Sequence, residues 1–131
     1  MIVGTEWLIE AFDCEASKLR EVETLREVVT RVITDLNLKT LGEGFWHQFE
    51  GENGVTGLVA LTESHLACHT YPEYKTATFN LYCCRTRPAW NWAGNLKEML
   101  GANEVKITKI ERGNPQSEIR NPKSQTVGGE A

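Results

Sequence analysis

The chain has 131 residues, of which 40% are hydrophobic and 24% are charged. That size and composition fit one domain with a real hydrophobic core and exclude a collagen, a disordered chain and a membrane protein. The net charge of −4 argues against a nucleic-acid binder, because such proteins are usually basic. Residues 1–6 lack the basic start of a signal peptide, so we expect a cytoplasmic protein.

The chain opens with a predicted strand and a predicted helix. Residues 6–12 are aromatic and branched enough for a strand. Over residues 17–36 the apolar side chains recur at spacings of three and four, which predicts a helix with one buried stripe. Thr24 with Glu27 forms a possible capping box, so the regular helix is expected to begin there. Residues 45–50 predict the next strand.

The middle of the chain predicts strands that are linked as hairpins. An Asn-Gly turn at residues 51–54 leads into residues 55–62, which are apolar on both faces and therefore expected inside the sheet. Residues 65–71 continue as extended chain until Pro72 breaks the run. Residues 76–84 alternate between apolar and polar side chains, as in a half-buried strand.

A second helix, a last strand and a tail close the chain. Pro88 suits the first turn of a helix over residues 89–100, and residues 104–111 predict a strand with an irregularity. The polar stretch 113–131 is expected to be a disordered tail. The order of elements predicts an α+β two-layer sandwich, with an antiparallel sheet and helices on one face, in which residues 1–112 form a single domain.

Reactive side chains concentrate in residues 63–73, and the residues alone leave three interpretations open. A zinc site would draw on nitrogen and sulfur ligands: His65, Cys68, His69 and Cys83 or Cys84. A hydrolase would use Ser64 beside a histidine, although no nucleophile elbow surrounds this serine. In the third interpretation the histidines are hydrogen-bonded residues of a core strand. On an extended strand His65 and His69 would face away from Cys68, which counts against zinc.

One stretch resembles the bacterial and archaeal S-adenosylmethionine decarboxylase proenzymes: Glu63-Ser64-His65-Leu66-x-x-His69-Thr70-x-Pro72-Glu73, followed by a strand that ends in Cys84. The resemblance covers residues 5–112 and includes His47-x-Phe49 and Gly54-Val55-Thr56-Gly57. It implies a pyruvoyl-dependent decarboxylase that makes the aminopropyl donor for spermidine. The alternative is an L-arginine or L-ornithine decarboxylase on the same scaffold, and the remote alternative is a zinc-binding domain without enzymatic activity.

The resemblance implies that the chain cuts itself between Glu63 and Ser64. The Ser64 hydroxyl would attack the Glu63 carbonyl and form an ester. Elimination and hydrolysis would then leave residues 64–131 beginning with a pyruvoyl group, which is the cofactor. In the family this group forms a Schiff base with the substrate amine and withdraws electrons as carbon dioxide leaves.

The same resemblance assigns roles to three further residues. His69 would assist processing, and Thr56 stands where the family usually has a serine near the same bond. Cys84 would return a proton to the α-carbon, and its place on the polar face of the strand agrees, whereas Cys83 shares the apolar face. Ser64 and His69 would face opposite ways on a regular strand. Bringing them together needs either a bend near the scissile bond or the extra freedom of a new chain end after cleavage.

Substrate and partners also follow from the resemblance. Phe49, Leu66 and Glu73 are the expected substrate-binding residues. Tyr71 and Arg85 depart from the family's usual Trp and Gly, and these departures leave the identity of the substrate open. The expected partners are the small-molecule substrate, the two cleavage fragments for each other and a second processed copy in a homodimer. No metal, nucleic acid or membrane is expected to bind.

Overall fold

The computed structural model describes residues 1–113, which form six strands and four helical segments. The strands are β1 (Gly4–Phe12), β2 (Phe45–Gln48), β3 (Val55–Leu61), β4 (Ser64–Tyr71), β5 (Thr76–Cys83) and β6 (Glu104–Arg112). The helices are α1 (Ala16–Leu19), α2 (Val22–Asp35), α3 (Trp92–Leu100) and the short 3-10 helix η1 (Pro72–Tyr74). Apart from Gly113, the predicted tail lies outside the described residues.

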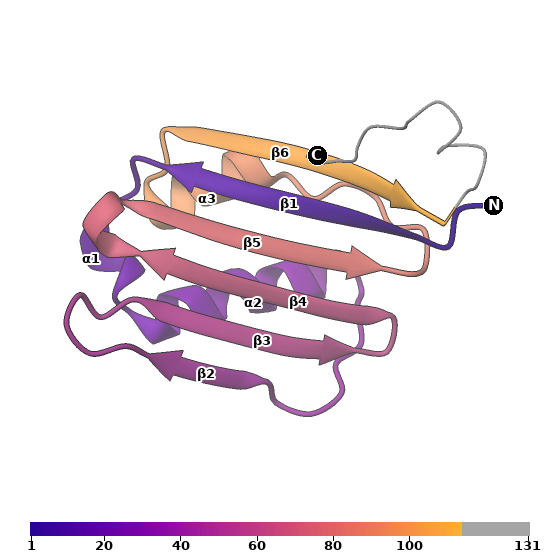
Figure 1. Cartoon of the computed structure of the whole chain (residues 1–131), viewed down its shortest axis with the longest axis horizontal. Coiled ribbons are helices and arrows are strands. Elements are labelled where there is room, and N and C mark those ends of the chain that lie inside the picture. The colour runs from indigo at the N-terminus through magenta and orange to yellow at the C-terminus, as the bar shows by residue number, and fades with distance from the viewer. Residues whose placement is uncertain (114–131) are drawn as a thin grey trace.

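All six strands form one antiparallel sheet in the order β2-β3-β4-β5-β1-β6, with α1, α2 and α3 behind it (Figure 1). The predicted α+β two-layer sandwich is therefore confirmed. The predicted irregularity in β6 is wrong, because β6 pairs with β1 without a break from Glu104 to Arg112. Its apolar residues Ile107 and Ile110 simply lie on opposite faces. No helix within the described residues is long and apolar enough to cross a bilayer.

The first predicted helix is in fact two helices. The Arg20 carbonyl accepts a hydrogen bond of 2.6 Å from the Gln48 side chain, and α2 starts afresh after Glu21. The predicted capping box is wrong, because Thr24 and Glu27 both lie inside α2. The Thr24 hydroxyl instead donates to the Glu21 carboxylate at 2.6 Å. The contact between Arg20 and the β2 strand thus divides a segment whose apolar spacing is continuous.

The second predicted helix starts later than expected. Pro88 lies in the loop before α3, and Asn91 caps the helix by accepting a hydrogen bond from the Gly94 backbone N–H at 3.1 Å. Between them, the Trp90 indole donates to the Asp35 carboxylate at the end of α2 at 2.8 Å. This contact ties the loop to the neighbouring helix, and α3 begins only after it, at Trp92.

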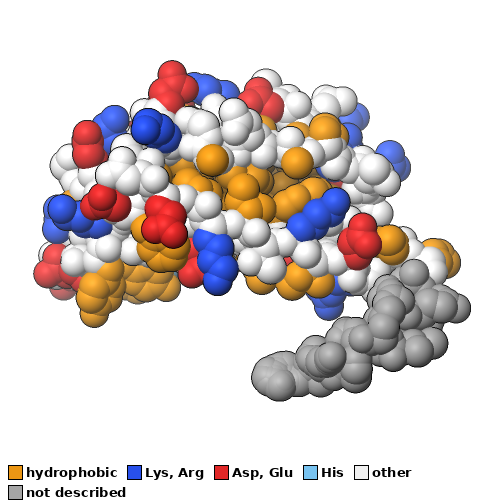
Figure 2. All heavy atoms as spheres, turned by 90° about the horizontal axis from the view of Figure 1, so that it is seen from above, with side chains coloured by type: hydrophobic (Ala, Val, Ile, Leu, Met, Phe, Trp, Pro, Cys, Tyr) orange, Lys and Arg blue, Asp and Glu red, His pale blue; other side chains and the backbone are white. Residues whose placement is uncertain are grey.

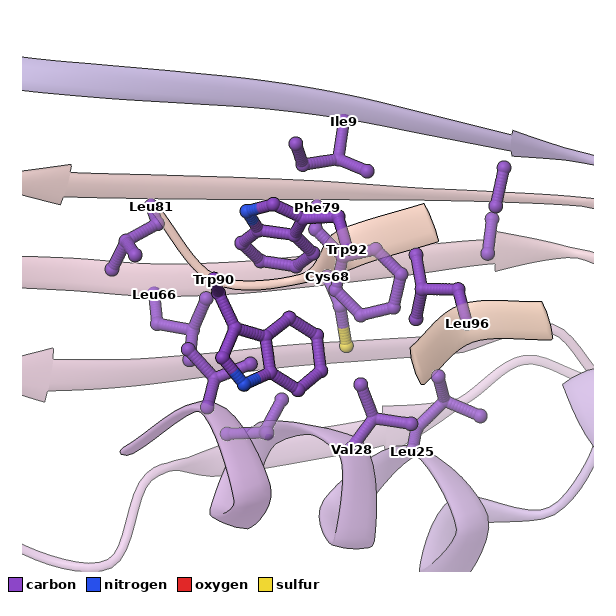
Figure 3. Packing of buried hydrophobic residues seen from close by; sticks show 14 of the residues in the cluster. Ile9, Leu25, Val28, Leu66, Cys68, Phe79, Leu81, Trp90, Trp92 and Leu96 are labelled. Carbon is purple, nitrogen blue, oxygen red and sulfur yellow. The ribbon is translucent and has the colours of Figure 1, made fainter. Parts of the chain in front are cut away.

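The hydrophobic core lies between the sheet and the helices (Figure 3). Alternate residues of the central strands point into it and meet apolar residues of α2, α3 and the loop before α3: Ile9, Leu66, Cys68, Phe79, Leu81, Leu25, Val28, Trp90, Trp92 and Leu96. The helices leave β6 partly uncovered, since Ile107 is 47% exposed. Figure 2 views the molecule from the side of β6 and shows apolar side chains at the surface in the middle of this view.

The other face of the sheet, the open face, is not covered by any helix of the described residues. It carries a mixture of polar, aromatic and aliphatic side chains: Glu6, Leu8, His47, Thr56, Leu58, His65, Ala67, His69, Tyr71, Thr78, Asn80, Tyr82 and Ile110. Strand β3 lies inside the sheet as predicted, but only one of its faces is buried. Leu58, on the open face, is 45% exposed.

Candidate active site

The predicted site residues lie at the two ends of β4, which runs from right to left in Figure 1. Ser64 begins the strand, and His69 lies near its other end. At about 3.3 Å per residue, the two are about 16 Å apart along the strand. The structure therefore divides the site into a scissile-end cluster (Glu63, Ser64, His65, Asn80 and Cys84) and an aromatic-end cluster (Phe49, Thr56, His69, Tyr71 and Glu73).

The backbone is strained at Ser64. Its φ is +143°, in a region that favours glycine and that other residues adopt only when the surrounding structure holds them there. Ser64 follows the tight turn from β3 to β4 and lies opposite both Leu61 and Cys83. The backbone therefore departs from regular strand geometry at the residue that would be converted, although Ser64 and His69 stay at opposite ends of β4.

The Glu63 carbonyl, which belongs to the predicted scissile bond, accepts a hydrogen bond of 3.0 Å from the Cys84 backbone N–H. A fixed donor at this oxygen stabilises the negative charge that forms when a nucleophile attacks the carbonyl carbon. Cys84 follows the end of β5 and its thiol is exposed, whereas Cys83 is buried as predicted. The arrangement can support an acyl transfer at the Glu63–Ser64 bond.

The Glu63 side chain is only 4% exposed and is held by a partner that the sequence analysis missed. The Arg87 guanidinium donates to both carboxylate oxygens: Nε lies 3.0 Å from Oε1, and Nη2 makes a second, very short hydrogen bond to Oε2. These hydrogen bonds from Arg87 hold the pKa of Glu63 below its usual value despite burial. A buried acid needs such a partner, but no sequence pattern singles out Arg87.

The Ser64 hydroxyl contacts the neighbouring imidazole, with Oγ 3.0 Å from Nδ1 of His65. The other ring nitrogen, Nε2, lies 2.7 Å from Oδ1 of Asn80 on β5. The Asn80 amide nitrogen in turn donates to the Glu6 carboxylate on β1 at 2.8 Å. A connected line of side chains thus crosses three strands of the open face and ends at the predicted nucleophile.

The aromatic-end cluster surrounds His69. The Thr56 hydroxyl lies 2.6 Å from Nδ1 of His69, which brings the two residues predicted to assist processing together. The His69 ring lies between Phe49 and Tyr71, with ring centroids 5.5 Å and 4.5 Å away. A cleft of about 300 Å³ runs along Phe49, His69, Tyr71 and Glu73. Two of the predicted substrate-binding residues, Phe49 and Glu73, therefore line one cleft.

Leu66 lies apart from this cleft. Its side chain is fully buried in the core between β4 and the helices, and its main chain lies inside the sheet between β3 and β5. The structure therefore does not bring Leu66 to the cleft with Phe49 and Glu73.

The structure does not bring the residues of the zinc interpretation together. Cys68 points into the core, where Figure 3 shows its sulfur among apolar side chains, while His65 and His69 lie on the open face. Burial raises the pKa of Cys68 and of Cys83 to about 12, so both thiols keep their protons at neutral pH. Among residues 1–113, no three His, Cys, Asp or Glu side chains are placed to hold a metal ion.

Comparison with known proteins gives one consistent result. The family model described as S-adenosylmethionine decarboxylase matches residues 5–113. A protein of Prochlorococcus marinus named S-adenosylmethionine decarboxylase proenzyme is 33% identical over 94% of this chain and 100% of its own length. A Moorella thermoacetica protein of the same name is 32% identical over 85% and 88%. The crystal structure of the adenosylmethionine decarboxylase from Aquifex aeolicus superposes with a TM-score of 0.74 at 29% identity, covering 86% of this chain and 92% of that one.

Proposed function

The chain belongs to the S-adenosylmethionine decarboxylase family, and we propose that it is a self-processing cytoplasmic enzyme that decarboxylates S-adenosylmethionine to the aminopropyl donor for spermidine synthesis. One observation carries the processing half of this proposal. A backbone N–H, from Cys84, is directed at the carbonyl of the bond before a strained serine. The relatives are named proenzymes, which agrees with a chain that must be cut before it acts.

In the proposed cleavage, Ser64 Oγ forms a bond to the carbonyl carbon of Glu63. The Glu63–Ser64 amide bond breaks, its nitrogen gains a proton, and an ester joins the two residues. Loss of the Ser64 α-proton then expels the Glu63 carboxylate and leaves an unsaturated residue at position 64. Water adds to this residue, and its nitrogen leaves as ammonia. The products are residues 1–63 with a new carboxylate and residues 64–131 with a pyruvoyl group.

The residues around Ser64 fit a group of this kind. The pyruvoyl group supplies an electron sink when the substrate loses its carboxylate. Cys84 is held by its backbone at Glu63, so its exposed thiol lies at the same end of the sheet as the modified residue. We therefore assign to Cys84 the return of the proton to the substrate α-carbon.

The sheet would hold the two fragments together after the cut. Residues 1–63 contain β1, β2 and β3, and residues 64–131 contain β4, β5 and β6. In the sheet β1 lies between β5 and β6, and β3 pairs with β4. Strands of one fragment thus pair along their length with strands of the other, so separating the two fragments would require breaking the sheet.

A homodimer would complete the site. In one chain the aromatic-end cluster is about 16 Å from Ser64, at the spacing of an extended strand. Thr56, His69 and Tyr71 of one cluster and His65 and Asn80 of the other lie on the open face. Two copies that pack open face to open face about a two-fold axis would bring the aromatic-end cluster of each to the scissile-end cluster of the other. The exposed apolar residues of this face, Leu8, Phe49, Leu58, Tyr71 and Ile110, favour such burial.

In this dimer the partner's His69 and the partner's Thr56 assist processing. Phe49 would stack on the adenine, and its ring also suits a sulfonium ion through cation–π attraction. Glu73 would accept hydrogen bonds from the ribose hydroxyls.

The test supplies S-adenosylmethionine, L-arginine and L-ornithine, each labelled at the carboxyl carbon, and counts the carbon dioxide released. We expect release from S-adenosylmethionine alone, and none from the Ser64→Ala variant. Release from arginine or ornithine alone would instead support the alternative substrate on this scaffold. A cut chain that releases nothing from any of the three would refute the assignment as a decarboxylase of these substrates.

A further inference from the structure

We propose that His65 is the base that accepts the Ser64 hydroxyl proton in the first step of self-cleavage. Asn80 and Glu6 are positioning residues that hold its imidazole in the reactive form. The inference rests on the proposed self-processing and names the residue responsible for one step of it. It starts from the contact between Ser64 Oγ and His65 Nδ1 at 3.0 Å.

The hydrogen-bond line fixes which ring nitrogen carries the proton. The Glu6 carboxylate can only accept, so the Asn80 group that faces it at 2.8 Å is the NH2 group. The Asn80 oxygen therefore faces His65 Nε2 at 2.7 Å, and Nε2 must carry a hydrogen to donate to it. In the neutral ring this leaves a lone pair on Nδ1, directed at the Ser64 hydroxyl.

His69 cannot take this role within the same chain. It lies about 16 Å along β4 from Ser64, at the rise of an extended strand, and its Nδ1 is engaged by Thr56 at 2.6 Å. In the proposed dimer the partner's His69 approaches the scissile bond from outside the chain. It is then free to act on the ester, after His65 has served the first proton transfer.

The charged and titratable groups that face His65 come from three other strands. Tyr82 lies opposite on β5, with ring centroids 6.0 Å apart, and Glu6 on β1 reaches the imidazole only through Asn80. Arg112 on β6 lies 3.4 Å from the Glu6 carboxylate and 4.9 Å above the Tyr82 ring. The residue opposite His65 on β3 is Ala60, which carries no charge. Glu6 is therefore paired, and no described carboxylate contacts the imidazole directly.

The step balances without a co-reactant. The Ser64 O–H proton moves to Nδ1 of His65 as Oγ bonds to the Glu63 carbonyl carbon. The carbonyl oxygen takes the negative charge, facing the Cys84 N–H. As the C–N bond breaks, the proton on Nδ1 passes to the departing nitrogen of Ser64, which gives the ester, a free amine and a neutral imidazole.

The experiment follows freshly translated full-length proenzyme over time by gel and intact mass. Half of each sample is treated briefly with hydroxylamine at neutral pH, which cleaves the ester, so that every chain past the first step is counted. Intact mass distinguishes this cut from a slower one at the Asn53–Gly54 bond. We expect His65→Ala to slow this first step by about 100-fold or more. His47→Ala, which removes a histidine on the same face, should form ester and fragments at the wild-type rate.

Two further readouts separate a base from a structural residue. Added imidazole should restore part of the rate in His65→Ala and leave the wild-type rate unchanged. The wild-type rate should rise with pH and then level off, because a base acts only without its proton, and His65→Ala should lose this rise. Asn80→Ala and Glu6→Gln should slow the first step less, by about 10-fold, and imidazole should not rescue them.

The proposal would be overturned if His65→Ala formed the ester at the wild-type rate, or if its rate kept the pH-dependent rise. If His69→Ala, and not His65→Ala, abolished ester formation, the base would be His69. A wild-type chain that never cleaves would refute the self-processing itself, which is a different result. If His65→Ala loses the native circular dichroism spectrum, the first step is measured in His65→Gln instead. A wild-type rate that does not change with pH would also overturn the proposal.

Discussion

Thr70 on β4 offers a measurement of how the strand that carries the site is held. The residue is 2% exposed, yet its side chain is polar. Its hydroxyl donates to the Leu19 carbonyl at the end of α1 at 2.8 Å and accepts from the Val55 N–H at the start of β3, also at 2.8 Å. Thr70→Val keeps the shape of the side chain and leaves both backbone groups without this partner.

An unpaired buried backbone group costs about 1 to 3 kcal/mol, so two cost about 2 to 6 kcal/mol. Burying the added methyl group returns about 1 kcal/mol. We therefore expect Thr70→Val to lower the free energy of unfolding by about 3 kcal/mol. At a urea dependence of about 1.5 kcal/mol per molar, the unfolding midpoint should fall by about 2 M.

The assay is urea unfolding followed by circular dichroism in the Ser64→Ala background, where the chain stays uncut, with all variants at the same protein concentration because a dimer would make the midpoint depend on it. The matched control is Thr70→Ser, which keeps the hydroxyl, loses one methyl group and should cost about 1 kcal/mol. Hydrophobicity alone predicts the reverse order, since valine suits a buried strand position. A Thr70→Val chain as stable as the wild type, or more stable than Thr70→Ser, would refute the reasoning.

Three further predictions concern the site. Cys84→Ser keeps the backbone N–H at Glu63, so it should slow turnover at least 100-fold while cleavage stays within a few-fold of the wild-type rate; equal losses in both would contradict the assigned role. Arg87 lowers the pKa of Glu63, so the stability from this pair is present above the ordinary glutamate pKa and is lost as pH falls through the lowered one. In the uncut background, Arg87→Leu should therefore unfold more easily at pH 7, and this difference should shrink as the pH falls below the ordinary glutamate pKa; a difference that does not change with pH would count against the pair. Phe49→Ala and Glu73→Gln should each raise KM about 10-fold with cleavage unchanged, and an unchanged KM would remove these residues from the binding site.

Much of the fold was predictable because its strands alternate and its helices have one apolar stripe. Phe79, Leu81 and Cys83 fall on one face of β5 by parity alone, and all three are buried. The errors occur where a tertiary contact overrides a local pattern. The Gln48 side chain donates a hydrogen bond to the Arg20 carbonyl, where the first predicted helix divides in two. The apolar sequence of β3 does not indicate that only one face of this strand is buried.

The candidate site was predictable as residues but not as a geometry. The spacing around Ser64 and His69 identifies the family, yet it does not show that the two lie at opposite ends of one strand. The contact of Arg87 with Glu63 joins residues from different segments of the chain, and so does the line from Ser64 through Asn80. Such contacts depend on which strands become neighbours, and no periodicity in the sequence encodes them.

The central claim is that the chain breaks its own backbone before Ser64, and intact mass spectrometry of the purified protein tests it most directly. We expect two species, residues 1–63 and residues 64–131. The second should be lighter by one ammonia than a fragment that starts with serine, and its keto group should accept hydride from borohydride. Ser64→Ala should give one full-length mass. A wild-type protein that keeps its full mass after prolonged incubation, with an unmodified serine at position 64, would contradict the account.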